Sequence, residues 1–337
     1  MRTADIALLG YGAMGRAYHR LIRTHPELMP LVGRLHVGTR SAAAPWAPLD
    51  ERDAAGSVED ALADGPPAAV IIATPADTHE ALAHRALDVG AHVLVEKPAA
   101  MTARGARALN RHAEEAGRSI QVVSQLRRVE AWGRARERIR AGRLGPVRSA
   151  LVDLPLWRSD AYFAASPARS EHELGNLAYH ELDLAVWCLG PVARITVAPP
   201  PAGGPGSGPI ARLAPFTAVL EHSSGCVTTL RYTTLAYPGR APRLSFDGTA
   251  GALVLESGAV VVDLAPPPAD VPDAGIYARQ TTVPDVAADW LAPHVAQLRG
   301  FLADPPRTSP RRLDEASIGT IDLIHRMHQH LNREEPA

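Results

Sequence analysis

Residues 5–15 read DIALLGYGAMG, an apolar run that leads directly into three glycines with the spacing Gly10-x-Gly12-x-x-Gly15. The spacing alone is common, but here it stands between a predicted strand and a predicted helix. Glycines at these positions make a tight turn and let a pyrophosphate approach the backbone at the helix N-terminus. The stretch predicts a dinucleotide site, with a purely structural glycine turn as the alternative. The expected cofactor contacts in it are Gly10, Tyr11, Gly12, Ala13, Met14 and Gly15.

Short apolar strands alternate with amphipathic helices over the first 124 residues. This alternation is typical of a parallel α/β sheet, so residues 1–124 are expected to form a Rossmann dinucleotide-binding domain. The Ala- and Pro-rich stretch 41–56 is expected to be a loop, and Ser57 is expected to cap the helix that follows it. The predicted strands are residues 5–9, 31–37, 68–73, 92–95 and 120–123.

The pattern changes after about Ser124, and residues 125–337 are expected to form a second, α+β domain that binds substrate. Residues 216–264 alternate in the strand period, with hairpin signals at Ser224-Gly225 and Asp247-Gly248, which predicts an open, mostly antiparallel sheet. A Pro/Gly loop is expected at 199–209. Whether the C-terminal helix packs back on the first domain is left open by the sequence. The other predicted elements are helices at about 129–141, 174–189 and from 314, and a strand at 147–154.

Composition excludes several classes of protein. The 337 residues carry a formal net charge of -1, which gives no field for nucleic acid or an anionic membrane. The apolar runs are strand-length, and the chain enters its first strand too early for a signal peptide. Cys188 and Cys226 lie in unrelated segments and suggest neither a disulfide framework nor a zinc site. We therefore expect a soluble, cytoplasmic protein without a metal.

The stretch after the second predicted strand bears on the choice of cofactor. A carboxylate there would bind the ribose 2′-hydroxyl of NAD(H), but no acidic residue occurs between Leu28 and Leu49. The segment Thr39-Arg40-Ser41 instead offers a cation and two hydroxyls, which suit a 2′-phosphate. The sequence therefore predicts that NADP(H) is preferred over NAD(H). The alternative is that Arg40 is a solvated loop residue.

Lys97 is the only lysine among 35 basic residues, and the other 34 are arginines. Lysine presents a compact ammonium that exchanges a proton more readily than a guanidinium, so a surviving lysine marks a position where arginine fails. Glu96-Lys97-Pro98 follows one predicted strand and Thr74-Pro75 follows another, and ligands of open parallel sheets bind at such strand ends. We expect Lys97 to face the nicotinamide. The alternative is that a lysine occurs at this position by chance and has no functional role.

A polar constellation occurs in the predicted helix 174–189. Asn176, His180 and Asp183 share one face at the spacing i, i+4 and i+7, although a polar stripe is more often merely solvated. Other polar and aromatic residues of the second domain are candidate substrate contacts, and for Trp157 and Tyr162 a core position is the alternative. The candidates are Arg127, Trp157, Arg158, Tyr162 and Tyr237, together with Lys97, Asn176 and His180.

These motifs resemble, in order and over most of the chain, the Gfo/Idh/MocA oxidoreductases. The resemblance rests on the glycine loop, on Gly90-x-His92-x-x-x-Glu96-Lys97-Pro98 and on the helix that contains His180. It implies that Lys97 contacts the reacting oxygen, that His180 is the acid/base, that the site lies between the domains, and that the second sheet forms a dimer or tetramer surface. It also implies cofactor contacts from Ala73, Thr74, Pro75, His79, Glu96, Lys97 and Gln125.

The chain departs from the family pattern in one place. The usual helix motif is Asp-x-Gly-x-His-x-x-Asp, and here Asn176 and Ala178 replace the aspartate and the glycine. The expected activity is interconversion of a secondary alcohol and a ketone on a sugar, sugar nucleotide or cyclitol. The alternatives are a reductase for an imine or a conjugated double bond, and a non-catalytic dinucleotide sensor.

Overall fold

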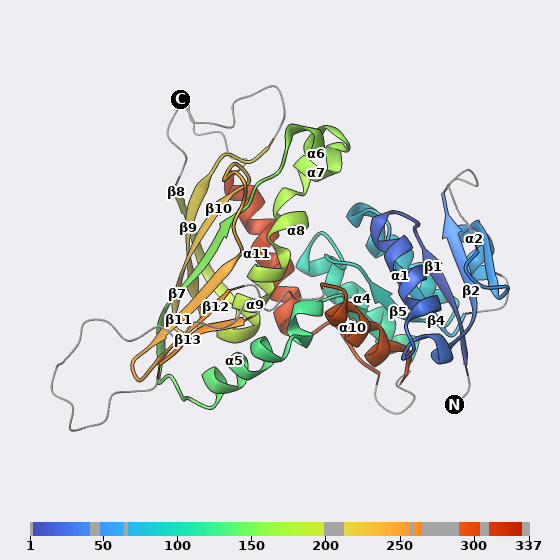
Figure 1. Ribbon diagram of the computed structural model, residues 1–337, viewed down its shortest axis with the longest axis horizontal. Helices are drawn as coiled ribbons and strands as arrows, with labels where there is room; N and C mark the ends of the chain where they lie inside the picture. The colour runs from blue at the N-terminus through green and yellow to red at the C-terminus, as the bar shows by residue number, and fades with distance from the viewer. Residues whose placement is uncertain are drawn as a thin grey trace. The chain divides into compact units, whose positions relative to one another are not determined.

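The computed structural model divides the chain into two compact units (Figure 1). The first unit combines Met1–Gln125 with Trp290–Ile321, and the second combines Leu126–Asp289 with Asp322–Ala337. The chain thus leaves the first unit and returns to it. The structure describes residues 3–40, 48–63, 67–198, 212–256, 259–264, 290–303 and 310–331.

The described part of the first unit contains a six-stranded sheet with the order β3-β2-β1-β4-β5-β6. Every pair of neighbouring strands in it is parallel. The order reverses between β1 and β4, which is where open parallel sheets bind ligands. The strands are β1 Ala4–Leu9, β2 Val32–Thr39, β3 Asp53–Ser57, β4 Ala69–Ile72, β5 His92–Val95 and β6 Ile120–Val122.

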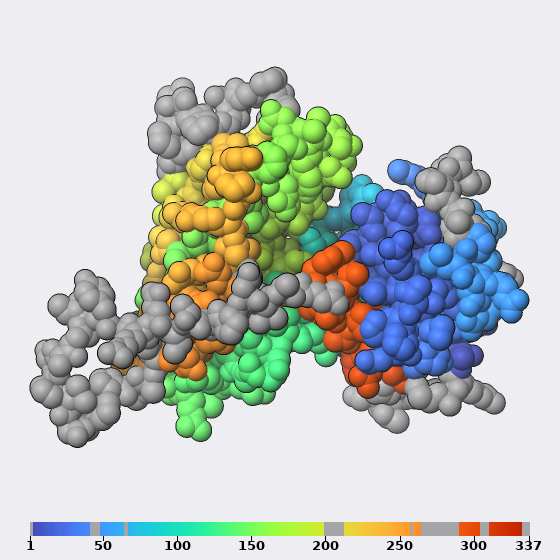
Figure 2. All heavy atoms as spheres, in the orientation of Figure 1, coloured from blue at the N-terminus to red at the C-terminus, as the bar shows by residue number. Residues whose placement is uncertain are grey.

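Helices follow the strands because their apolar faces bury against the sheet. Tyr18 and Ile22 of α1 join a hydrophobic core cluster of this unit. Helix α10 joins the same cluster through Val295, Leu298 and Phe301, and Figure 2 shows this orange-red segment against the blue N-terminal residues. The helices are α1 Ala13–Thr24, α2 Val58–Ala63, α3 His79–Asp88, α4 Ala103–Glu115 and α10 Ala292–Leu302, with 3-10 turns η1 Met29–Leu31 and η2 Ala76–Thr78.

The expectation of a loop at 41–56 is wrong for its last residues. Strand β3 begins at Asp53 and pairs in parallel with β2, from Leu35 opposite Asp53 to Thr39 opposite Ser57. Its sequence has no apolar alternation, so its formation depends on backbone pairing with β2 and on the buried side chain of Asp53. Ser57 caps α2 as expected, accepting the Asp60 N–H at 3.0 Å. Residues 41–47 and the predicted loop 199–209 lie outside the described residues.

The second unit contains, in its described residues, a seven-stranded sheet with the order β13-β12-β11-β7-β10-β9-β8. Only β7 and β10 pair in parallel, so the expected fold class, a Rossmann domain followed by an α+β domain with a mostly antiparallel sheet, is confirmed. The strands are β7 Val147–Pro155, β8 Val192–Ala198, β9 Phe216–His222, β10 Val227–Thr233, β11 Arg243–Gly248, β12 Ala252–Glu256 and β13 Ala259–Leu264.

Both expected hairpins occur, between β9 and β10 and between β11 and β12. Helices α8, α9 and the second half of α11 lie along one face of this sheet (Figure 1). No helix within the described ranges is long and apolar enough to cross a membrane. The helices are η3 Gln125–Arg128, α5 Glu130–Arg140, α6 Asp160–Ala164, α7 Pro167–Glu171, α8 Glu173–Leu177, α9 Tyr179–Leu189 and α11 Glu315–Leu331.

The backbone of Gly10 packs directly against the residues that follow β4. Its φ is +95°, and a Cβ there would stand 2.6 Å from the carbonyl oxygen of Ala73 and 2.8 Å from the nitrogen of Thr74. The Gly10 N–H also donates to the Gly38 carbonyl at 2.8 Å. The chain can leave β1 at this point only if residue 10 lacks a side chain.

Substitution at this position should be more costly than at another glycine of positive φ. Gly117 has a φ of +61° and open space around its Cα, so Gly117→Ala should cost about 1–2 kcal/mol of unfolding free energy. Gly10→Ala adds a backbone overlap and should cost about 2–5 kcal/mol in all. Urea denaturation of both variants measures the difference. Equal losses would show that the contact with Ala73 is not restrictive.

Candidate active site

The glycine loop has the shape that a pyrophosphate requires. A Cβ at Gly15 would overlap the carbonyl oxygen of Gly10, so this glycine lets the turn close on itself. A Cβ at Gly12 would meet no heavy atom within 4 Å, so the backbone is open on that side. Gly12 precedes α1, whose first turn has no side-chain cap and no acidic residue. Backbone N–H groups and the helix dipole there favour an anion.

The end of β2 carries the residues expected to select the cofactor. Thr39 is the last residue of β2, and Arg40 is exposed and makes no hydrogen bond or ion pair with any described residue. Ser41 lies outside the described residues. The first two aspartates downstream are already paired, Asp50 with Arg52 at 2.7 Å and Asp53 with Arg23 at 2.7 Å.

His79 joins the loops that follow β4 and β5. The imidazole is 1% exposed, with Nε2 at 2.8 Å from the carbonyl oxygen of Thr74 and Nδ1 at 2.7 Å from that of Pro98. Ala73, Thr74 and Pro75 therefore lie on one side of this ring, and the loop that contains Lys97 lies on the other. A buried ring in contact with two backbone oxygens positions these loops, and direct contact of His79 with a cofactor stays a prediction.

Glu96 and Lys97 follow β5 directly. The Glu96 carboxylate accepts the hydroxyl proton of Tyr18 and, at 3.1 Å, the backbone N–H of Lys97. Burial and the neighbouring Glu96 carboxylate raise the pKa of the Tyr18 phenol well above its ordinary value, so Tyr18 remains a donor. Tyr18 on α1 thus holds the Glu96 carboxylate in place, and this carboxylate in turn holds the backbone of Lys97. The sequence pattern marked Tyr18 only as a helix residue.

Helix 174–189 is not continuous, which corrects the predicted polar stripe. Ala178 has φ -118° and ψ -4° and separates α8 from α9, so Asn176 and His180 lie on different helices. The Asn176 side-chain amide donates to the Ala168 carbonyl at 3.1 Å. His180 is in the first turn of α9, edge-on to the Tyr179 ring.

Arg127 and Asp183 form a buried ion pair. Arg127 Nε donates to Asp183 Oδ2 at 2.6 Å, and a second guanidinium nitrogen binds the other oxygen. The two side chains are 11% and 2% exposed. Both oxygens of Asp183 therefore bind Arg127, which also lies 5.5 Å above the Trp187 ring. The pair joins η3 to α9, so Arg127 has a structural partner besides any substrate.

The remaining candidates form two clusters within the second unit. Trp157 is 39% exposed and packs edge-to-face on Tyr237, which is 78% exposed, so the core alternative for Trp157 is wrong. Tyr162 is partly buried, with the guanidinium of Arg158 at 5.6 Å and that of Arg169 at 4.5 Å from its ring centre. Arg169, not expected from the sequence, is next to the residue that accepts the Asn176 amide proton.

Glu173, at the start of α8, was also not expected from the sequence. Its fully buried carboxylate accepts the Tyr232 hydroxyl and the Leu213 N–H, each at 2.8 Å. Burial raises the pKa of Glu173 above its ordinary value.

Gln125, the last residue of the first unit, is 8% exposed. No cluster of three or more His, Cys, Asp or Glu among the described residues is arranged to hold a metal ion.

Comparison with known proteins yields matches in both units. Residues 4–124 match the Gfo/Idh/MocA profile described as an oxidoreductase family with an NAD-binding Rossmann fold, and residues 132–254 match the C-terminal domain of the same family. The chain belongs to the Gfo/Idh/MocA family of oxidoreductases. The Rossmann assignment of the first unit and the recognition of the family from its motifs are thereby confirmed.

Relatives of this Gfo/Idh/MocA chain carry names of sugar and cyclitol dehydrogenases. Inositol 2-dehydrogenase 1 of Saccharopolyspora erythraea is 31% identical over 58% of the chain, and D-apiose dehydrogenase of Paraburkholderia graminis is 27% identical over 66%. The matches span 57% and 62% of those two proteins. The WlbA dehydrogenase of Bordetella pertussis, solved with NADH and UDP-GlcNAcA, has the same fold, with a TM-score of 0.71, 21% identity, and coverage of 96% of this chain and 95% of that one.

Disruption of the Arg127–Asp183 pair should destabilise this oxidoreductase strongly. Arg127→Met removes the cation and leaves a buried carboxylate, which should lower the free energy of unfolding by about 3–5 kcal/mol. A double variant, Arg127→Met with Asp183→Asn, removes both charges and should recover part of that loss. Urea denaturation of the three proteins measures it. A single variant as stable as the parent would show that Arg127 is available for another role.

Proposed function

We propose that this chain interconverts a secondary alcohol and a ketone on a sugar, sugar nucleotide or cyclitol. The observation that carries the proposal is Lys97, the only lysine, whose backbone follows β5 and is held by Glu96. The loop after the neighbouring β4 packs against the glycine loop. The names of the relatives, which act on inositol and D-apiose or were solved with a sugar nucleotide, support this class of substrate.

In the proposed mechanism Lys97 and His180 supply different groups. The Lys97 ammonium binds the reacting oxygen and stabilises the negative charge that develops on it. His180 accepts the proton of the alcohol, or returns it to the ketone in the reverse direction. A bound nicotinamide supplies the site at C4 that accepts or donates the hydride. Trp157, Arg158, Tyr162 and Tyr237 are proposed as contacts for the remainder of the substrate.

Asn176 replaces the aspartate of the family motif, and we propose two roles for it. A neutral amide gives Lys97 none of the Coulomb stabilisation that a carboxylate would give, so His180 would carry more of the proton transfer. Alternatively, Asn176 only hydrogen-bonds a substrate hydroxyl. The hydrogen bond from its amide to Ala168, beside Arg169, supports a role in shaping the substrate pocket.

NADP(H) is proposed as the preferred cofactor. The exposed guanidinium of Arg40 directly after β2, without a partner among the described residues, suits a 2′-phosphate. The pairing of Asp50 and Asp53 with arginines supports the same preference, because neither carboxylate is available to bind a ribose hydroxyl without losing its partner. The NADH in the WlbA complex keeps NAD(H) as the alternative.

Arg40→Ala should weaken NADP(H) binding by about 1.5–3 kcal/mol, which is roughly 10- to 150-fold, and leave NAD(H) binding almost unchanged. Fluorescence titration of the nicotinamide with both cofactors measures this. Arg34→Ala is the matched control, since Arg34 is an exposed arginine of β2 that pairs with Asp5. Equal losses for the two cofactors, or a parent protein that prefers NAD(H), would contradict the assignment.

Lys97→Arg should reduce turnover about 100-fold although the charge is retained, because a fork of donors does not fit a point-charge site. His180→Ala should reduce alcohol oxidation by about 100- to 10,000-fold. Dinucleotide affinity should change little in either variant. The assay is turnover on a panel of sugars, nucleotide sugars and cyclitols.

Retention of more than about a tenth of the turnover by Lys97→Arg would remove Lys97 from the mechanism. Dinucleotide binding without turnover on any alcohol or ketone of the panel would favour a sensor. Turnover confined to imines or conjugated double bonds would favour the reductase alternative.

Self-association through the outer face of the second sheet also stays a proposal. Val219 of β9 and Val227 of β10 lie on this face and are 36% and 39% exposed. These exposed apolar side chains lie on the face opposite the one that the helices cover, and they support the proposed self-association.

A further inference from the structure

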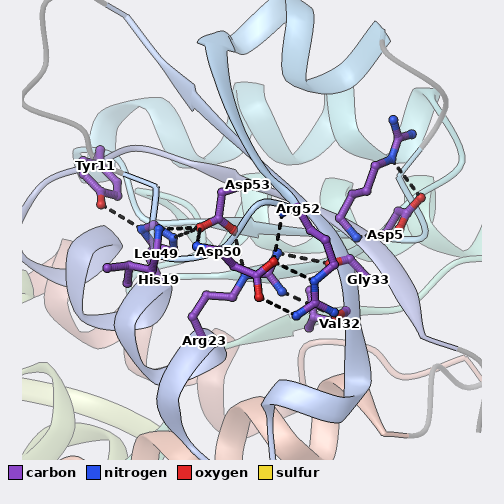
Figure 3. Close-up of polar contacts among 11 residues, drawn as sticks. Asp5, Tyr11, His19, Arg23, Val32, Gly33, Leu49, Asp50, Arg52 and Asp53 are labelled. Carbon is purple, nitrogen blue, oxygen red and sulfur yellow. Dashed lines mark hydrogen bonds and ion pairs between the residues drawn. The ribbon is translucent and has the colours of Figure 1, made fainter.

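Asp53 is the centre of a buried polar cluster in the first unit (Figure 3). Its side chain is 0% exposed and accepts four hydrogen bonds. His19 Nε2 lies at 2.9 Å, Arg23 Nε at 2.7 Å, and the backbone nitrogens of Leu49 and Asp50 at 2.8 and 2.9 Å. Four donors satisfy a carboxylate that burial would otherwise make unfavourable.

The charge of this carboxylate is balanced inside the cluster. Arg23 is 1% exposed and also donates to the Gly33 carbonyl at 3.1 Å, so its guanidinium is held beside Asp53. Burial alone would raise the pKa of Asp53, but the hydrogen bonds from His19 and Arg23 lower it below its ordinary value. Asp53 is therefore an anion at neutral pH and can only accept hydrogen bonds.

The anion determines the direction of the hydrogen bonds beyond it. His19 Nε2 must carry a hydrogen to donate to Asp53, and in the neutral ring Nδ1 is then an acceptor. The Tyr11 hydroxyl lies 2.8 Å from Nδ1 and is the donor to it when the ring is neutral. The relay therefore runs from the Tyr11 phenol through the His19 imidazole to the Asp53 carboxylate, and Figure 3 shows the three side chains in this sequence.

The two ends of the relay lie in the segments proposed to bind the dinucleotide. Tyr11 stands between Gly10 and Gly12 of the glycine loop. Its backbone carbonyl oxygen also accepts a hydrogen bond from the Arg16 guanidinium, at 3.0 Å. At the other end, the backbone groups that bind Asp53 belong to the connection from β2 to β3, the connection that begins with Arg40. One buried carboxylate thus holds both segments.

We propose that Asp53 and His19 are positioning residues for the adenosine diphosphate half of the dinucleotide. They hold Tyr11, and through Tyr11 they keep the glycine loop in the conformation that presents its backbone to the pyrophosphate. This inference rests on the proposed function, because it assumes that a dinucleotide binds at this loop. Tyr11, His19 and Asp53 contact no reacting atom, so their effect should fall on binding rather than on the chemical step.

Tyr11→Phe removes only the hydroxyl and is the mildest test. Calorimetric titration with ADP, which lacks the nicotinamide, should show a loss of about three- to tenfold in affinity, the scale of one neutral hydrogen bond. NADPH and NADH should lose the same factor. In turnover assays the KM for the dinucleotide should rise by that factor while kcat stays unchanged. His19→Gln should show a similar loss, and the double variant should lose less than the product of the single losses.

Tyr232→Phe is the matched control, because it removes a phenol that donates to a buried carboxylate, Glu173, in the second unit. It should lower thermal stability without changing ADP affinity. If Tyr11→Phe behaves like this control, with lower stability and unchanged ADP affinity, the relay is only structural and the inference is wrong. If the parent protein binds neither ADP nor a dinucleotide, the proposed function fails as well. A His19→Gln variant that does not fold leaves Tyr11→Phe to decide.

Discussion

The carbonyl group of Ala73 lies so close to the Cα of Gly10 that no side chain fits between β1 and the end of β4. This contact brings the carboxyl ends of the two central strands together where the strand order reverses. Helix α1 can then begin three residues later with an uncapped N-terminus. His79 links this region to the next strand, because its ring contacts both the loop after β4 and the loop after β5, where Lys97 is located.

Helix α1 organises the rest of the candidate cofactor site through its side chains. Two consecutive residues of this helix bind carboxylates in different parts of the candidate site. Tyr18 binds Glu96, which is next to Lys97, and His19 binds Asp53, which is at the start of β3. Each buried carboxylate lies beside a strand of the sheet and receives its donors from α1 and from local backbone. The same helix thus has an uncapped N-terminus that suits an anion, and its side chains support both flanking loops.

The sequence was sufficient to predict elements whose signals are local. The glycine loop has its three glycines at fixed spacing after an apolar run, and the strand His92–Val95 is a short apolar run between Gly90 and Pro98. Strand β3 was not predictable, because Asp53–Ser57 lacks alternation and its stabilising partners come from α1. Helix α10 contains Gly300 near its C-terminal end, which weakens the helical pattern. The break at Ala178 has a helical pattern on both sides and is visible only in the backbone.

The polar partners of the site residues were the least predictable part. Arg127 with Asp183 and Tyr18 with Glu96 are separated by 56 and 78 positions, so spacing rules for one helix or strand do not apply to them. The residue types indicated the proposed chemistry, as with the single lysine at position 97, but their partners depended on the tertiary fold.

A crystal structure of the chain with a bound nicotinamide dinucleotide tests the central claim most directly. The pyrophosphate is expected at the N-terminus of α1 against the backbone of Gly12, and the nicotinamide is expected beside Lys97. A dinucleotide bound elsewhere, or a pyrophosphate with no contact to the glycine loop, would contradict it.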